Sequence, residues 1–342
     1  MTRPTINDVA RAAGVSKGAV SFALNSRPGL APGTRERILK VAQEIGWTPS
    51  FRARALSVSR ALAVGLVIAR PPDTLGADPF FPSFIAGLES VLSEHDHALL
   101  LQVVADHERE RPSYRRLVDE GRVDGVFVTD LFVDDPRPAL LAELGLPAVI
   151  IGPALGKGIW PAVGVDDAPG IMGAVEHLVA LGHSHIAHVA GPHGMVHGHS
   201  RQRAWSTALL RAGLAQGPCI EADFSAESGA AATRQLLDLA EPPTAIVYAN
   251  DLMAMAGMSL AQSRGIDVPT DLSITGYDDT EIAAHLQPTL TTVSSDVIGT
   301  GRAAATRLLE LIDKQPPTDI VLPPARLVVR NSSGPWRPTH RP

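Results

Sequence analysis

From Leu62 onwards, short apolar runs alternate with segments that have the residue spacing of helices, and this alternation continues past residue 275. Strands that alternate with helices predict parallel sheets covered by helices on both faces. The stretch is too long for one sheet of ordinary size, so we expect two α/β subdomains with a cleft between them. The clearest apolar runs are AVGLVIA, ALLLQVV, VDGVFVT, PAVIIG, HIAHVAG and AIVYAN.

The first 48 residues have a different pattern, that of three short helices. Thr5 can cap the first helix, with an acidic residue three positions later completing a capping box, and Gly14 ends it. Ser16 can cap a second helix that runs to about Leu24, and Pro32 opens the third. Three helices with a glycine-containing turn between the first two predict an all-α helix-turn-helix headpiece.

These patterns divide the chain into four parts: a helix-turn-helix domain (1–48), a linker that could become helical (49–61), a two-subdomain α/β core (62–330) and a flexible tail (331–342).

Charge separates the headpiece from the rest of the chain. Residues 1–61 contain ten Lys and Arg against three Asp and Glu, whereas the remainder contains twenty against thirty-three. A small basic head on an acidic body indicates that the head meets a polyanion and the body does not. The alternative is a chance distribution of surface charge.

The composition also bears on the compartment. A single cysteine, Cys219, excludes an internal disulfide framework and fits a reducing environment. No apolar run approaches the length of about 20 residues that a membrane span needs. The N-terminus, MTRPTINDVARAAG, lacks the apolar stretch of a signal peptide. We therefore expect a cytoplasmic protein without a membrane partner.

The second predicted helix has one apolar face and one polar face. Val20, Ala23 and Leu24 take the inward positions, which leaves Lys17, Gly18, Ser21 and Phe22 to face outward. A recognition helix presents such side chains to base edges in the major groove, while small hydroxyls bind phosphates. A buried helix that contains a glycine would show the same pattern.

The linker contains the sequence ARAL, which places Leu56 beside arginines on a segment with no core of its own. An apolar side chain flanked by basic residues suits insertion into a kinked minor groove. Alternatively, the leucine packs on the core domain.

Several motifs in order along the chain resemble the lac repressor family of bacterial transcription regulators. They are TINDVARAAGVSKGAVSFALN, GWTPS, ARAL, DPFF, VDDAPG, VEHLVALGHSHIAHVAG, AND and ITGYDD, and the resemblance covers about residues 4–334. It implies a core like that of periplasmic sugar-binding proteins, with a small-molecule effector in the cleft. It also implies a homodimer on a palindromic operator in double-stranded DNA.

The resemblance implies a role for each candidate DNA-binding residue. Lys17, Gly18 and Phe22 stand where the family contacts bases, and Leu56, with Ala53, where it inserts its hinge-helix wedge. The phosphate contacts and remaining candidates are Thr5, Ser16, Ser21, Asn25 and Thr34. Gly18 offers no side chain, and Phe22 cannot make the bidentate contact of an arginine to guanine. Base preference therefore cannot be copied from relatives.

For the cleft, residues near the carboxyl ends of predicted strands are the candidates, because ligands of α/β sheets bind there. Aromatic faces together with Asp, Asn and Arg suit a polyhydroxylated ligand. Single members could instead cap helices or pack in the core, and Asp251 and Asp279 are expected to be caps. The candidates are Phe80, Phe81, Asp130, His197, Arg201, Phe224, Asn250 and Asp278.

The sequence gives less support to other functions. The histidines of the HGMVHGH loop have no cysteine nearby to complete a zinc site, so we expect no metal. GTGRAA fits a dinucleotide-binding pattern but falls inside a predicted helix, so we expect no cofactor and no enzyme. The sequence thus predicts a transcriptional regulator, more specifically a repressor, controlled by a sugar or sugar derivative. The alternative is a sugar-binding transport receptor, which would need a signal peptide and no basic head.

Overall fold

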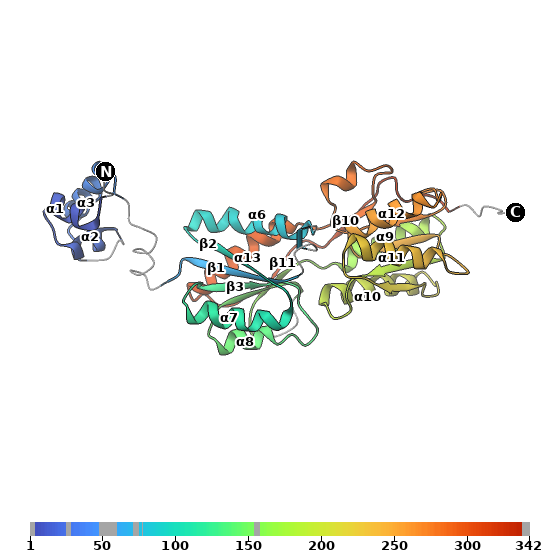
Figure 1. Ribbon diagram of the computed structural model, residues 1–342, viewed down its shortest axis with the longest axis horizontal. Helices are drawn as coiled ribbons and strands as arrows, with labels where there is room; N and C mark the ends of the chain where they lie inside the picture. The colour runs from blue at the N-terminus through green and yellow to red at the C-terminus, as the bar shows by residue number, and fades with distance from the viewer. Residues whose placement is uncertain are drawn as a thin grey trace.

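A computed structural model describes residues 4–24, 29–47, 60–70, 75–76, 78–153 and 158–336. These residues form a small helical headpiece and a core of two α/β subdomains (Figure 1). The predicted division into an all-α head and a two-subdomain parallel-sheet core is confirmed. Asn25, Ala53 and Leu56, three of the predicted DNA-contacting residues, lie outside the described residues.

The headpiece consists of α1 (Ile6–Ala13), α2 (Lys17–Leu24) and α3 (Pro32–Glu44). Thr5 and Asp8 form the predicted capping box of α1, and Gly14 ends this helix with φ +64°. The Ser16 hydroxyl accepts a hydrogen bond from the Ala19 amide at the start of α2. The three helices bury one small cluster that includes Val9, Val20 and Ile38.

The N-terminal subdomain contains a six-stranded parallel sheet. Its order is β11 (Ile320–Val321), β5 (Ala162–Gly164), β4 (Ala148–Ile151), β3 (Gly125–Val128), β1 (Ala63–Ala69), β2 (Ala98–Val104). Helices α6 (Phe80–Leu92) and α13 (Val297–Ile312) cover one face, and α7 (Glu110–Asp119) and α8 (Arg137–Glu143) cover the other (Figure 1). Short 3-10 helices lie at Ser93–His95 and His107–Arg109.

The C-terminal subdomain contains a four-stranded parallel sheet in the order β7 (Cys219–Glu221), β6 (Ile186–Ala190), β8 (Ala245–Tyr248), β9 (Ser273–Thr275). Helices α9 (Ala168–Ala180) and α10 (Val196–Arg211) pack on one face, and α11 (Ala226–Leu237) and α12 (Asp251–Ser263) on the other. An antiparallel pair, β10 (Thr292–Ser294) and β12 (Arg326–Val328), and a 3-10 helix at Glu281–Ala284 complete it.

Glycines of the GTGRAA motif serve helix packing. A Cβ on Gly301 would lie 2.4 Å from the Phe84 carbonyl oxygen, and one on Gly87 would lie 2.2 Å from the Ile298 carbonyl oxygen. Only glycines let the backbones of α6 and α13 approach this closely. The motif lies inside α13, as predicted, and does not form a strand-to-helix turn.

The two subdomains are joined by chain crossings and by an exchange of side chains. Phe132 of the N-terminal subdomain forms an antiparallel bridge with Met195 and packs on the core cluster of the C-terminal subdomain. Val196 packs in the opposite direction, on a core cluster of the N-terminal subdomain. This contact brings the loop after β3 to the first turn of α10.

The structure corrects both predicted ends of the core. Arg60, assigned to the linker, donates hydrogen bonds to Asp313 and to the Ile312 carbonyl, and the Ala61 amide donates to Asp124. Residues 331–336, predicted to be a flexible tail, pack on the core: the Ser332 hydroxyl donates to the Ile274 carbonyl. Both segments are polar and look like loops in sequence. In the fold the Arg60 side chain binds the end of α13, and the backbone amides of Asn331 and Ser332 donate to the Thr289 carbonyl.

Among the residues described by the structure, no helix has the length and apolar character needed to cross a bilayer.

Candidate functional site

The sheet topology selects where a ligand can bind. In the N-terminal sheet, β2 and β3 lie on opposite sides of β1, and in the C-terminal sheet β7 and β8 lie on opposite sides of β6. Chain connections leave in opposite directions at such switch points, which opens a crevice at the carboxyl ends of the strands. Both crevices open onto a single cavity between the subdomains; the space in it and in its mouth, which is open to solvent, is about 890 Å³.

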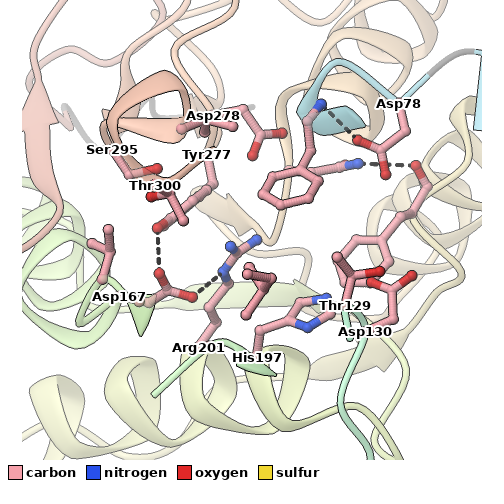
Figure 2. A pocket seen from close by; sticks show the side chains of 18 of the residues that line it. Asp78, Thr129, Asp130, Asp167, His197, Arg201, Tyr277, Asp278, Ser295 and Thr300 are labelled. Atoms are coloured by element: carbon pink, nitrogen blue, oxygen red, sulfur yellow. Dashed lines mark hydrogen bonds and ion pairs between the residues drawn. The ribbon is translucent and has the colours of Figure 1, made fainter. Parts of the chain in front are cut away.

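This cavity brings together all but one of the predicted effector-site residues. Phe80 comes from the start of α6, His197 and Arg201 lie on α10, and the others follow strands. Those that follow strands are Asp130, Phe224, Asn250 and Asp278. Figure 2 shows Asp130, His197, Arg201 and Asp278 around the same space.

Phe81 is the exception, and its assignment to the cavity is corrected. Its side chain is 2% exposed and belongs to the core of the N-terminal subdomain. Successive residues of a helix point about 100° apart, and here α6 is turned so that only Phe80 points into the cleft. Phe80 lines the cavity, while Phe81 packs beneath it with ring centroids 5.2 Å apart and planes nearly perpendicular.

Arg70, which follows β1, carries a buried ion-pair network. Its Nε and Nη2 donate to the two carboxylate oxygens of Asp130 at 2.8 and 2.7 Å, and Nη1 donates to Asp78 at 2.7 Å. Burial alone would raise the pKa of Asp130, but the adjacent guanidinium outweighs burial and lowers it. All three nitrogens of Arg70 are therefore occupied by protein carboxylates.

Arg201 is held in a second network on the opposite wall. Its Nε donates to Asp167 at 2.9 Å and its Nη1 donates to the Ala249 carbonyl at 2.7 Å. Its guanidinium carbon lies 3.5 Å from the ring centroid of Tyr277, a cation–π contact, and the Tyr277 hydroxyl donates to Asp167 (Figure 2). The two N–H groups of Nη2 and the second N–H of Nη1 are the parts of Arg201 left for a ligand.

Asp278 has a different environment. Among the described residues no ion pair and no side-chain hydrogen bond reaches its carboxylate, which carries no dashed line in Figure 2; only the Asp251 backbone amide and the charge of Arg201 favour its ionised form. Burial, followed by the nearby Asp251 carboxylate, raises the pKa of Asp278 well above its usual value. Its backbone has φ +122°, which is strained for a residue other than glycine. Strain and an unpaired carboxylate together mark a position adapted to a ligand.

His197 and Asn250 complete the cavity wall in different ways. The His197 ring stacks on Phe224 with centroids 5.3 Å apart, and burial, with Arg201 nearby, lowers its pKa to about 4. The imidazole is therefore neutral at neutral pH. Asn250 accepts a hydrogen bond from the Met253 amide and donates one to the Phe224 carbonyl. The Asn250 side-chain amide therefore holds the cavity wall together through hydrogen bonds within the protein.

In the same region, the prediction that Asp251 and Asp279 cap helices is wrong. Asn250, and not Asp251, is the N-cap of α12. Asp251 is fully buried and accepts hydrogen bonds from Thr280 and Thr292. Asp279 pairs with Arg330. The sequence alone could not show whether Asn250 or Asp251 accepts the hydrogen bond from the first-turn amides of α12.

The predicted DNA-contacting residues that the structure describes gather on the headpiece surface. Lys17 and Gly18 are exposed, and the Phe22 side chain is 41% exposed on the same helix. Val20 and Ala23 are buried beneath it, as predicted. Thr5 and Ser16 are exposed at helix starts, whereas Ser21 and Thr34 are half-buried. The helix thus presents an outward edge of low charge.

Several cavity residues were missed by sequence reasoning. Arg70 follows β1 just as Asp130 follows β3, so its position alone could have indicated it. Asp78, Asp167 and Tyr277 lie within the motifs DPFF, VDDAPG and ITGYDD. Thr129 ends the predicted strand before Asp130 and carried the same signal, whereas Ser295 and Thr300 carried none, because they reach the cavity only where the chain crosses between subdomains. No group of side chains that could hold a metal ion occurs within the described ranges.

A helix-turn-helix head joined to a two-subdomain core with an interdomain cavity defines a ligand-responsive DNA-binding regulator. Comparison with known proteins agrees. Residues 5–50 match the lacI family of bacterial regulatory proteins, and residues 175–333 match a periplasmic binding protein-like domain. The chain belongs to the lacI family of bacterial regulatory proteins.

Relatives match along nearly the whole chain. The HTH-type transcriptional regulator CelR of Thermobifida fusca is 35% identical over 96% of this chain and 98% of its own length. The HTH-type transcriptional repressor CytR of Escherichia coli K12 is 30% identical over 92% and 91%.

Solved structures agree with these relatives. A CelR–cellobiose complex matches with TM-score 0.74 at 34% identity, covering 96% of this chain and 100% of that chain. The lac repressor dimer bound to operator and an anti-inducer matches with TM-score 0.84 at 28% identity, covering 97% and 100%.

Proposed function

We propose that this chain is a homodimeric transcriptional repressor that reads a palindromic operator and is switched by a sugar or sugar derivative in the interdomain cavity. The observation that carries the proposal is the cavity itself. It combines aromatic faces, an unpaired carboxylate and hydroxyl groups on a chain that begins with a helix-turn-helix. The CelR–cellobiose complex supports a carbohydrate as the class of ligand.

Helix α13 offers a direct route from the cavity to the linker. Val297 and Thr300, in its first turn, line the cavity. At its other end, Ile312 and Asp313 bind Arg60, which lies at the C-terminal end of the predicted linker. A ligand that prefers one arrangement of the subdomains would move this helix end, and with it the linker, by population shift. An effector with equal affinity for both arrangements would change nothing.

The exposed edge of the N-terminal sheet supports homodimer formation. β2 is a seven-residue edge strand, and its Leu101 and Val103 side chains are 47% and 41% exposed. An apolar edge strand of this length is a template for association. We propose that it lies in the dimer interface, because one recognition helix reads too few base pairs and two-fold symmetry matches a palindrome.

For DNA contact, we propose Lys17, Gly18 and Phe22 on base edges, with Ala53 and Leu56 as the minor-groove wedge. The proposed phosphate contacts and remaining candidates are Thr5, Ser16, Ser21, Asn25 and Thr34. A protein with these partners works in the cytoplasm and has no catalytic role, and we propose both for this chain.

The function is tested in two steps. An operator selected by the full-length protein from random DNA serves as the probe for fluorescence anisotropy, first without sugar and then with each member of a sugar panel. We expect tight binding to a palindrome and a large change in affinity with one sugar. Thermal unfolding identifies that sugar, because a ligand at 100 times its dissociation constant raises the free energy of unfolding by about 2.7 kcal/mol. A selection without any palindromic sequence would refute the proposal.

A further inference from the structure

We propose that the cavity takes an uncharged polyhydroxylated ligand and excludes phosphorylated or carboxylated forms of the same molecule. This inference rests on the proposed function and specifies the effector's charge. It follows from how the cavity's cations, helix termini and carboxylates are used inside the protein.

The two guanidinium groups of the cavity already bind carboxylate and carbonyl groups of the protein. Each of the three nitrogens of Arg70 donates to Asp78 or Asp130, and Arg201 uses two nitrogens on Asp167 and the Ala249 carbonyl. Turning either arginine toward an anionic ligand would leave carboxylates unpaired in a buried site, which is strongly unfavourable. The N–H groups left on Arg201, chiefly the two of Nη2, lie near the carboxylates of Asp167 and Asp278, which already offset its charge, so they suit a hydroxyl better than a further anion.

Helix N-termini, the other usual source of anion binding, are occupied as well. Five helices begin at the cavity. In α10 the Val196 amide donates to the Leu131 carbonyl, and in each of the other four a side chain of this protein binds an amide of the first turn. The pairs are Asp78 with the Phe80 amide in α6, Asp166 with Ala168 in α9, Asn250 with Met253 in α12, and Asp296 with Gly299 in α13. Three of these four caps are carboxylates, which would repel an anion.

The charge around the ligand space is negative. Asp78, Asp130, Asp167 and Asp278 line it against two arginines, and no lysine does so among the described residues. His197 contributes no positive charge at neutral pH, because its pKa is lowered to about 4. A phosphate bound here would face the unpaired carboxyl group of Asp278, and each would disfavour ionisation of the other.

The remaining groups suit hydroxyls. The Asp278 carboxyl, the Arg201 Nη2 and the hydroxyls of Thr129 and Ser295 supply donors and acceptors on several sides, and the Phe80 ring supplies an apolar face. A sugar hydroxyl donates and accepts at once, so a neutral ligand can satisfy such a mixed set without a net charge.

The test compares matched neutral and phosphorylated pairs on the full-length protein: cellobiose, trehalose, glucose and ribose, each with its phosphate ester. Thermal unfolding finds the neutral sugar that binds, and titration calorimetry measures both members of that pair. We expect the phosphate ester to bind at least 100-fold more weakly. Equal or tighter binding of the ester would overturn the inference while leaving a sugar effector in place.

A variant makes the charge argument independent of the particular sugar. Asp78→Asn keeps an acceptor for the Phe80 amide but frees Nη1 of Arg70 and removes one negative charge. We expect this variant to bind inorganic phosphate at least tenfold more tightly than the wild type does. Asp119→Asn, an exposed carboxylate on α7, should show no change. Equal phosphate affinity in Asp78→Asn and wild type would count against the inference.

If no sugar of either series binds, the proposal of a sugar effector is refuted. Thermal unfolding with inorganic phosphate and with sulfate then still tests whether the cavity excludes anions. Absence of stabilisation of the wild type by either ion supports exclusion of anions. A saturable stabilisation that is lost in Arg201→Ala would overturn it.

Discussion

Arg60 caps the C-terminus of the helix whose first turn lines the ligand cavity: its guanidinium donates to Asp313 at 2.8 Å and to the Ile312 carbonyl at 3.1 Å. The residues before Arg60 lead to the headpiece, so this contact is where the core holds the linker. An exposed ion pair adds little to stability, at most about 1 kcal/mol. Its position gives it a larger effect on control of DNA binding than on folding.

We therefore expect Arg60→Ala and Asp313→Ala to reduce the effector-induced change in operator affinity by about tenfold each, with little further loss in the double variant. Both act on the same contact, so their effects should not add. Operator affinity with and without effector, measured by anisotropy, provides the numbers. The matched control is Arg264→Ala, which breaks a similar exposed pair with Asp238 in the C-terminal subdomain and should leave control intact. Additive losses in the double variant would disprove the shared role.

Asp278→Asn should stabilise the empty protein at neutral pH and abolish the response to effector. The folded state raises the pKa of this carboxyl group, so folding at neutral pH works against its ionisation. Asparagine removes that penalty and tolerates positive φ better than most residues. The gain, about 1 kcal/mol or more at pH 7, should shrink as pH falls toward 4, where the unfolded carboxyl is also protonated.

Thermal unfolding between pH 4 and pH 8 measures this gain. Asp251→Asn serves as the comparison, because Asp251 accepts hydrogen bonds from Thr280 and Thr292 and its replacement should destabilise the protein. A lower stability of Asp278→Asn at pH 7 would contradict the unpaired state of this carboxylate.

Two glycines should respond in opposite ways to alanine. A Cβ on Gly18 meets only the Ser16 hydroxyl at 3.7 Å, an ordinary contact, so Gly18→Ala should stabilise the headpiece by about 1 kcal/mol. Gly301→Ala places a Cβ 2.4 Å from the Phe84 carbonyl oxygen and should cost about 1–3 kcal/mol by forcing α6 and α13 apart. Calorimetric scans of headpiece and core unfolding distinguish the two effects. Equal shifts in the same direction would show that the helix crossing is not close.

His188 should make stability depend on pH below neutrality. It is fully buried on β6, its Nδ1 donates to the Val247 carbonyl, and burial lowers its pKa to about 4. The unfolded chain takes up a proton near pH 6.5, so stability is complete above that value and is lost as pH falls toward 4.

His188→Gln should therefore flatten the pH dependence of the unfolding free energy between pH 6.5 and 4, by up to about 1.4 kcal/mol per pH unit. Urea titrations at several pH values measure the slope. The control is His285→Gln, which changes an exposed histidine and should leave the slope as it is. An unchanged slope in His188→Gln would show that the imidazole is not held neutral in the folded state.

Local sequence patterns determined much of this protein. Capping residues and helical spacing predicted the three headpiece helices, and the alternation of apolar runs predicted the parallel sheets. Those patterns depend on neighbours within a few residues, such as the Thr5 and Asp8 capping box, so the sequence contains all the information they need. Strand ends likewise predicted Asp130, Asn250 and Asp278 at one cavity, because parallel strands place their carboxyl ends together.

Tertiary structure alone decided which side chains are free to act. Phe80 and Phe81 are adjacent in sequence, yet only one faces the cavity. Arg70 and Arg201 are both cleft arginines, but partners between 8 and 60 residues away already bind all three nitrogens of Arg70 and two nitrogens of Arg201. Asp251 and Asp278 are both buried aspartates, and folding gives them different surroundings. Asp251 lies beside the hydroxyls of Thr280 and Thr292, whereas Asp278 lines the open cavity. Hydrogen bonding and burial depend on long-range contacts, and these exist only once each subdomain has folded.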